Sequence, residues 1–138
     1  LVRKEKYELP PEAIREMIIN AHCHRNLLDE SCIQVAVYDD RLEVTSPGGL
    51  YNGLTYEEVM NGHSKIRNKG IANIFSQMGL VEAWGSGIKR ILNAAEEYGL
   101  PKPRFQEFDN MFRVELFRNS FPMTNEKENI GGRVENRP

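Results

Sequence analysis

The chain has few cysteines and no long apolar run, and these absences exclude several classes of protein. Its 138 residues include two cysteines, Cys23 and Cys32, which do not make a disulfide framework, so a reduced cytoplasmic compartment is the simpler expectation. No apolar run approaches the roughly 18 residues of a membrane-spanning helix, and no signal peptide is visible. We therefore expect a cytoplasmic chain with no membrane contact.

An excess of positive charge is also missing. Eighteen Lys and Arg against twenty Asp and Glu give a net charge of -2, so the chain lacks the basic field that attracts a DNA duplex. Direct nucleic-acid contact would have to be local, through Lys65, Arg67 and Lys69 in the loop HSKIRNKG. A Walker loop, G-x-x-x-x-G-K-[ST], is absent too, so a translocating helicase motor is not expected.

What is present fits one domain with an ordinary core, because 40% of the residues are hydrophobic and 28% charged. Thr55 with Glu58 is typical of a helix capping box, and Asp109-Asn110 of a hairpin turn. Periodicity predicts, in order, a helix over 10–24, strands over 32–38 and 41–46, helices over 55–61, 68–78 and 88–98, and strands over 103–108 and 111–117.

This order predicts an α+β fold, with helices packed on a mixed, mostly antiparallel sheet. The ordered domain is expected to cover 1–118. Residues 119–138 are polar and lack periodicity, which predicts a flexible tail or linker. Because the chain begins at Leu1 rather than at a methionine, we expect it to be an excised part of a longer protein.

The first predicted helix, EAIREMIINAHCH, carries a polar stripe beside its apolar face. Glu16, Asn20 and His24 are four residues apart and therefore lie along one side of the helix. A carboxylate there could orient or deprotonate a water, and an amide oxygen could bind Mg²⁺. The spacing alone equally allows a solvated Glu16, an Asn20 bonded to backbone and a His24 at the helix end.

Two glycine-containing loops are candidate ligand sites. SPGGL, with Ser46, Gly48 and Gly49, follows a predicted strand, and its glycines would allow close backbone approach or simply form a turn. WGSGI, over 84–88, opens a helix, where free N–H groups and the helix dipole favour phosphate. Lys65 and Arg67 lie near another helix start and would suit an anion, or would form a solvated charged loop.

Taken together, E-x-x-x-N-A-x-x-H, DDRLEVTSPGGL, SKIRN and GLVEAWGSGIKRI occur in an order that resembles one family. It is the C-terminal ATPase-like domain of transcriptional regulators often labelled RecG-related ATP-dependent DNA helicases. The resemblance covers about Tyr7 to Arg118. It implies the GHKL superfamily, with gyrase, histidine kinases and MutL, in which an α/β sandwich holds nucleotide between helices and sheet. An AlbA-like (Schlafen-type) DNA-binding domain usually precedes this domain in the family.

The resemblance implies roles for the helix stripe and the glycine loops. Glu16 matches the acid that orients the hydrolytic water, which makes it the candidate catalytic residue, and Asn20 matches the amide that holds Mg²⁺. Ser46 stands where the family's adenine-contacting aspartate is expected, and the second glycine loop is short. The candidate ligand-contacting residues are Asn20, His24, Ser46, Gly48, Gly49, Lys65, Arg67, Gly85, Ser86 and Gly87.

Two functional hypotheses follow. The first is an Mg-ATP-binding regulatory domain, at most a slow ATPase, that reports nucleotide to a DNA-binding domain outside this fragment. The second is a degenerate GHKL scaffold that serves dimerisation, including a homodimer, or another protein contact without binding nucleotide. Retained Glu16 and Asn20 favour the first hypothesis, and Ser46 in place of the aspartate favours the second.

Overall fold

The computed structural model describes residues 7–50, 55–61, 66–81 and 87–119, and their elements follow the predicted order. Residues 120–138, most of the predicted tail, lie outside the described residues. Among the described helices, none combines the length and hydropathy needed to cross a membrane. The elements are α1 (Pro11–His24), β1 (Gln34–Val37), β2 (Arg41–Pro47), α2 (Tyr56–Met60), α3 (Lys69–Gln77), α4 (Gly87–Glu97), β3 (Arg104–Phe108) and β4 (Met111–Phe117).

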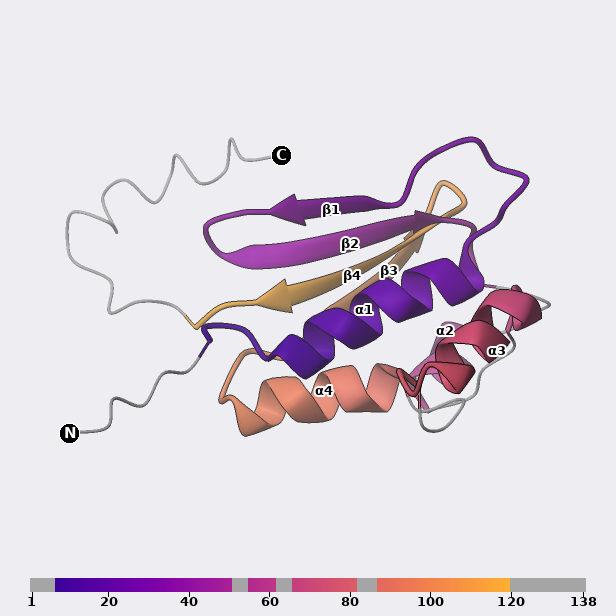
Figure 1. Cartoon of the computed structure of the whole chain (residues 1–138). Coiled ribbons are helices and arrows are strands. Elements are labelled where there is room, and N and C mark those ends of the chain that lie inside the picture. The colour runs from indigo at the N-terminus through magenta and orange to yellow at the C-terminus, as the bar shows by residue number, and fades with distance from the viewer. Residues whose placement is uncertain (1–6, 51–54, 62–65, 82–86, 120–138) are drawn as a thin grey trace.

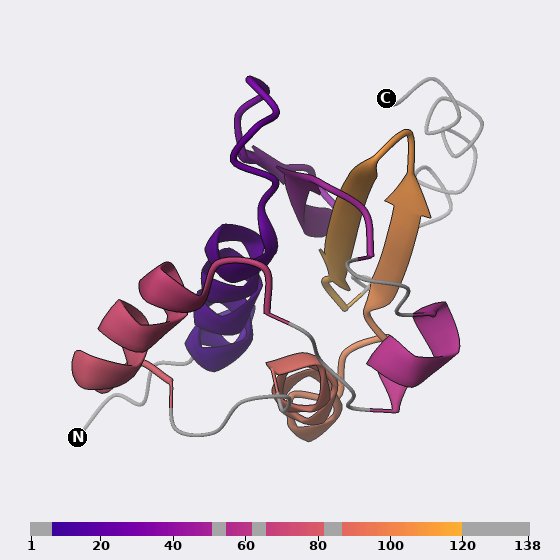
Figure 2. The ribbon, with the colours of Figure 1, turned by 90° about the vertical axis from the view of Figure 1, so that its right-hand side faces the viewer.

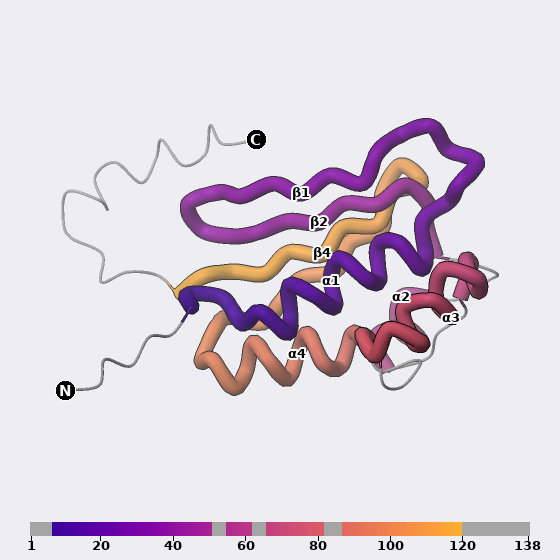
Figure 3. The backbone as a smooth tube through the Cα atoms, viewed as in Figure 1, coloured from indigo at the N-terminus to yellow at the C-terminus, as the bar shows by residue number. Residues whose placement is uncertain are grey.

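The four strands form one sheet in the order β1-β2-β4-β3, with each neighbouring pair antiparallel. Both predicted hairpins are confirmed, and their inner strands, β2 and β4, run side by side although they are far apart in sequence (Figure 3). No parallel pair occurs among the described strands. Asp109 and Asn110 both have positive φ, 47° and 58°, as the tight turn of a two-residue hairpin requires.

The helices form a layer on one face of the sheet (Figure 1). α1 and α4 run antiparallel to each other and enclose the main core with the sheet, while α3 packs on the side of α1 that is turned away from the sheet (Figure 2). The buried apolar residues of the main core are Ala13, Met17, Ala21, Leu42, Val44, Ile91, Ala94, Ala95, Phe105, Val114 and Leu116. A smaller cluster joins α1 to α3 through Ile19, Cys23, Ala72 and Val81.

Local sequence signals explain where several helices begin. Pro11 is the first residue of α1, where a missing N–H costs nothing. The predicted capping box is present before α2, because Thr55 Oγ1 accepts from the Glu58 N–H and the Glu58 carboxylate accepts from the Thr55 N–H. Asn68 takes the N-cap position of α3, but its side chain does not cap that helix.

The buried face of α1 is broader than its hydrophobic periodicity predicts. Ile18 lies at helical spacing with the apolar residues Ile14 and Ala21, yet 36% of its surface is exposed. Glu16, which belongs to the polar stripe beside the apolar face, is only 5% exposed. The reason is that α1 contacts the sheet, α4 and α3, so that only one side of the helix faces solvent.

The other face of the sheet carries a charged network. Glu43 and Glu115 lie opposite each other on β2 and β4, and both are buried. Arg41 pairs with both carboxylates, and Arg104 forms a second ion pair with Glu115 at 2.6 Å. Burial alone would raise the pKa of Glu115, but the bonds from Arg104 and the neighbouring charges hold it below its ordinary value. This network satisfies the charges that the strands bury away from the helices.

Candidate functional site

The candidate catalytic carboxylate is held by a residue of another helix. Glu16 lies on the side of α1 that faces α4, and its Oε1 accepts a hydrogen bond of 2.8 Å from Nη1 of Arg90. The two residues are 74 positions apart in the sequence, and the Arg90 side chain is 20% exposed. A buried carboxylate needs such a partner, because an isolated charge in this position would be costly. Arg90 is therefore part of this site, although no local pattern in the sequence indicates this role for it.

One turn further along α1, Asn20 lies against the first residue of α4. A Cβ atom at Gly87 would approach within 2.8 Å of Asn20 Nδ2 and 3.2 Å of Oδ1, so a larger residue at this position would require the Asn20 side chain to shift. Nδ2 is buried and has no hydrogen-bond partner among the described residues. Because buried polar groups are normally bonded, this amide is a candidate for contact with a ligand or a bound water.

Arg67, from the SKIRN motif, joins two segments of backbone. Its Nε donates to the carbonyl of His24 at 3.0 Å and its Nη2 donates to the carbonyl of Gly49 at 3.0 Å. The first carbonyl belongs to the last residue of α1 and the second to the SPGGL loop. In this arrangement Arg67 fixes the loop against the helix end, a role that the charge pattern did not reveal.

Asn68, the next residue of the motif, caps the C-terminus of α1. Its Nδ2 donates to the carbonyls of His22, at 2.9 Å, and Arg25, at 2.8 Å, while its N–H donates to the carbonyl of Cys23. The last carbonyls of a helix have no partner within the helix. Two consecutive residues of SKIRN thus bond to the backbone at the end of α1.

The SPGGL loop is positioned by internal contacts. The Ser46 hydroxyl is buried and donates to the carbonyl of Ala21 at 3.0 Å. Gly48 has a φ of 109°, and a Cβ atom there would come within 3.0 Å of the backbone nitrogen of Asn26. Close packing of two chain segments therefore explains the glycine at 48. At Gly49 a Cβ would meet only the flexible side chain of Glu107.

His24, the third member of the stripe, closes α1 close to Arg67. Burial lowers the pKa of His24 below its ordinary value, and the positive charge of Arg67 lowers it further. The imidazole is therefore neutral at pH 7. In that state one ring nitrogen is a hydrogen-bond acceptor and the other a donor.

The structure brings together only part of the predicted site. Glu16 and Asn20 face the start of α4, whereas Ser46, Gly48, Gly49, His24 and Arg67 meet around the C-terminal end of α1. The side chains of Glu16, Ser46 and Arg67 are engaged by protein groups. Three further candidates, Lys65, Gly85 and Ser86, lie outside the described residues.

The residues at the α1–α4 end fit a phosphate-bearing ligand with a metal ion. The amide of Asn20 offers a hard oxygen for Mg²⁺, and its Nδ2, to which no described residue bonds, could donate to a phosphate oxygen. Gly87 lets α4 begin in contact with that amide, where the free N–H groups of the helix attract anions. Among the described residues no cluster of three or more His, Cys, Asp or Glu forms a metal site. A bound metal would thus depend largely on the ligand's own oxygens.

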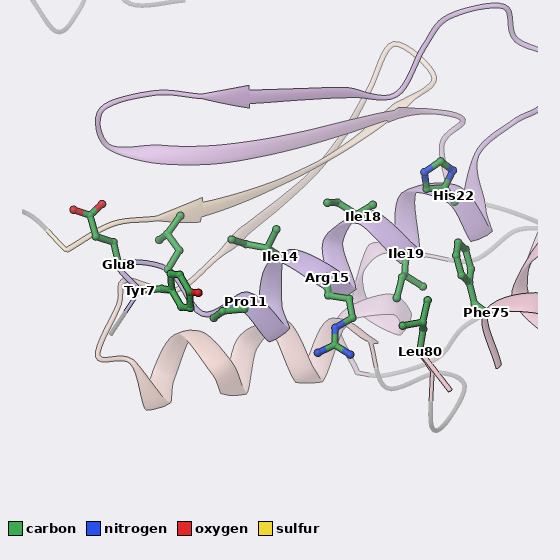
Figure 4. Close-up of a pocket in the computed structure, with 11 residues that line it drawn as sticks. Tyr7, Glu8, Pro11, Ile14, Arg15, Ile18, Ile19, His22, Phe75 and Leu80 are labelled. Atoms are coloured by element: carbon green, nitrogen blue, oxygen red, sulfur yellow. The ribbon is translucent and has the colours of Figure 1, made fainter. Parts of the chain in front are cut away.

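A groove of about 910 Å³ lies on a different side of α1 (Figure 4). Ile14, Ile18 and Ile19 contribute the helix side, and Phe75 and Leu80 lie at one end. Neither Glu16 nor Asn20 lines this groove. The apolar groove and the candidate phosphate site are therefore separate features of α1.

Comparison with known proteins gives a family match and a structural match. The family model described as "Putative ATP-dependent DNA helicase recG C-terminal" matches residues 30–116, which leaves α1 outside the matched range. No curated protein matches the chain. The crystal structure of the DIP2311 protein from Corynebacterium diphtheriae is similar, with a TM-score of 0.74 and 30% sequence identity. The match covers 80% of this chain but 23% of that one. The chain therefore belongs to the family of RecG C-terminal domains, and its antiparallel sheet with helices is the α+β fold of a GHKL-like ATPase.

Proposed function

We propose that this domain binds a magnesium nucleotide, with ATP as the first candidate, where α1 meets the start of α4. The observation that carries the proposal is the amide of Asn20, whose buried Nδ2 lies against Gly87 and has no hydrogen-bond partner within the described parts of the chain. Membership of an ATPase-like family supports the same ligand class. In this proposal Asn20 contacts the metal or a phosphate oxygen, and the N–H groups at the start of α4 contact the phosphates.

Hydrolysis, in this proposal, is slow at most. Glu16 is the group that would orient the attacking water, and bound Mg²⁺ would supply charge neutralisation on the phosphates. In the structure Glu16 is only 5% exposed and its carboxylate is paired with Arg90, so water has little access to it. A carboxylate in this state favours a sensor of nucleotide over an efficient enzyme.

The biological role that we propose is regulation. The chain spans 23% of the length of the similar solved protein, so DNA binding is assigned to another part of a longer regulator. The described residues supply no Walker-type motor, and the net charge of -2 does not favour duplex binding. We therefore propose that nucleotide occupancy is reported to an attached DNA-binding domain, within the cytoplasm.

Thermal unfolding of the isolated domain tests the ligand. A ligand at about 100 times its dissociation constant stabilises the native state by roughly 2.7 kcal/mol, which is several degrees for a domain of this size. We expect Mg-ATP to raise the Tm of the wild type, and we expect EDTA, which chelates Mg²⁺, to remove part of that increase. Asn20→Ala should lack this metal-dependent part of the increase. Asn93→Ala, at an exposed position of α4, is the matched control and should keep the full shift.

A second function is a scaffold that contacts another protein and binds no nucleotide. The observation in its favour is that the Ser46 hydroxyl and the Glu16 carboxylate are both used by internal bonds. If ATP, ADP and GTP at millimolar concentration all leave the Tm unchanged, and Asn20→Ala behaves like the wild type, the scaffold is the correct function.

A further inference from the structure

The guanidinium of Arg90 has two possible anionic partners, the carboxylate of Glu16 and a phosphate at the start of α4. It is the fourth residue of α4, within the first turn, and so close to the helix start that our proposed function assigns to phosphates. Its Nη1 is already bonded to Glu16 at 2.8 Å. Guanidinium groups bind phosphate and carboxylate by the same planar, charge-assisted hydrogen bonds, so either anion could be its partner.

The register of the two helices connects this ion pair to the candidate phosphate site. α1 and α4 are antiparallel, Asn20 contacts Gly87, and one turn away Glu16 contacts Arg90. An anion at the start of α4 would therefore be within one helical turn of Arg90. The rise of one turn is about 5.4 Å, which an arginine side chain can span.

Movement of the Arg90 guanidinium away from Glu16 has a free-energy cost, and this cost couples the movement to hydration of the Glu16 carboxylate. A buried carboxylate that loses its ion-pair partner, here Arg90, is strongly destabilised unless water reaches it. Transfer of Arg90 to a phosphate therefore favours entry of water beside Glu16, the group that is to orient water in the proposed reaction. Binding of the ligand is therefore coupled to exposure of the Glu16 carboxylate to water.

On the basis of the proposed function, we infer that Arg90 is a phosphate-binding residue that Glu16 holds in the ligand-free domain. Nucleotide phosphate takes the guanidinium from Glu16, and the carboxylate is released to water. Glu16 is in this sense a competitor for Arg90, so it weakens nucleotide binding even though it serves turnover. This competition predicts an unusual result, in which removal of the negative charge of Glu16 from the site tightens the complex.

Affinity measurements on purified protein test the exchange without an activity assay. The variants are Glu16→Gln, Arg90→Ala and the double variant, with Lys89→Ala as a control at an exposed neighbour in the same turn. Each is titrated with Mg-ATP, Mg-ADP and AMP by calorimetry, after a Tm measurement establishes that it is folded. Where Arg90→Ala does not fold, Arg90→Gln combined with Glu16→Gln removes both charges and takes its place.

We expect Glu16→Gln to bind Mg-ATP several-fold more tightly than the wild type, and Arg90→Ala to bind it several-fold more weakly. The benefit of Glu16→Gln should vanish in the double variant, and Lys89→Ala should match the wild type. If the wild type binds Mg-ATP and the folded Glu16→Gln variant binds it equally well or more weakly, the exchange is overturned and the proposed function stands. Absence of binding in the wild type and in Glu16→Gln alike would overturn the proposed function and the exchange together.

Discussion

The side-chain amide of Asn68 lies 2.9 Å from the carbonyl oxygen of His22 and caps a helix to which Asn68 does not belong. The same Nδ2 reaches the carbonyl of Arg25 at 2.8 Å, so one side chain satisfies two acceptors at the end of α1. Because Arg67 bonds to the carbonyl of His24 beside them, the SKIRN segment fixes the end of the helix that carries Glu16 and Asn20. The motif acts on the candidate site through the position of α1.

Asn68→Ala should therefore destabilise the domain. Two carbonyls at the helix end would lose their donor, which we expect to lower the free energy of unfolding by about 1–3 kcal/mol. Urea denaturation measures the loss. Asn93→Ala is the matched control, because Asn93 is exposed on α4 and alanine favours a helix. Equal stability of the two variants would show that the Asn68 bonds contribute nothing net.

Gly87→Ala and Gly70→Ala should have opposite effects, although both place a methyl group near the start of a helix. At Gly87 the new Cβ would meet the Asn20 amide at 2.8 Å, whereas at Gly70 nothing lies within 4 Å. We expect Gly70→Ala to be neutral or to stabilise by up to about 1 kcal/mol through helix propensity. Gly87→Ala should lower the Tm and, in our proposal, weaken Mg-ATP binding. Identical Tm values would mean that Asn20 moves aside freely.

Local signals in the sequence were sufficient for most of the fold. The capping box at Thr55 and Glu58 and the turn at Asp109-Asn110 each involve residues close in sequence, and the structure contains both. The paired strands of each hairpin alternate between the helix face and the charged face of the sheet, so periodicity located them as well. Local residues also mark several helix ends, because Pro11 begins α1, and Gly79 and Gly99 follow α3 and α4 with positive φ.

The candidate site was less predictable because its contacts are distant in sequence. Glu16 and Arg90 are 74 residues apart and Asn68 and His22 are 46 apart, and no local pattern indicates such pairs. The spacing of Glu16, Asn20 and His24 did place them on one side of α1. It did not reveal that α4 covers the first two of them, or that Ile18 is on the exposed side.

The two cysteines should differ sharply in their reaction with iodoacetamide at pH 8. Burial raises the pKa of Cys23 to about 11, and the charge of Glu16 contributes to the increase, so little thiolate forms. Cys32 is exposed. We expect modification of Cys32 alone in the native protein and of both thiols in urea, as read by mass spectrometry after digestion. The Cys32→Ser variant should remain unmodified when native, and rapid labelling of its Cys23 would mean that α1 opens from α3.

The stability of the domain should decrease as the pH falls below about 6.5 because of His24. Burial, and then the charge of Arg67, lower the pKa of His24 in the folded state below its ordinary value near 6.5. Between these two values the unfolded chain binds more protons than the native protein, so acidification through this window favours unfolding. The stability contributed by neutral His24 is complete above the unfolded pKa and is lost as the pH falls toward the folded pKa. A single group can contribute a slope of at most about 1.4 kcal/mol per pH unit.

Urea denaturation at several pH values tests this contribution. The plot of unfolding free energy against pH should be flatter for His24→Gln, a variant that retains the backbone carbonyl bonded by Arg67. His22→Gln, at an exposed position of the same helix, is the control and should keep the wild-type slope. If His22→Gln flattens the profile instead, the pH dependence does not come from His24.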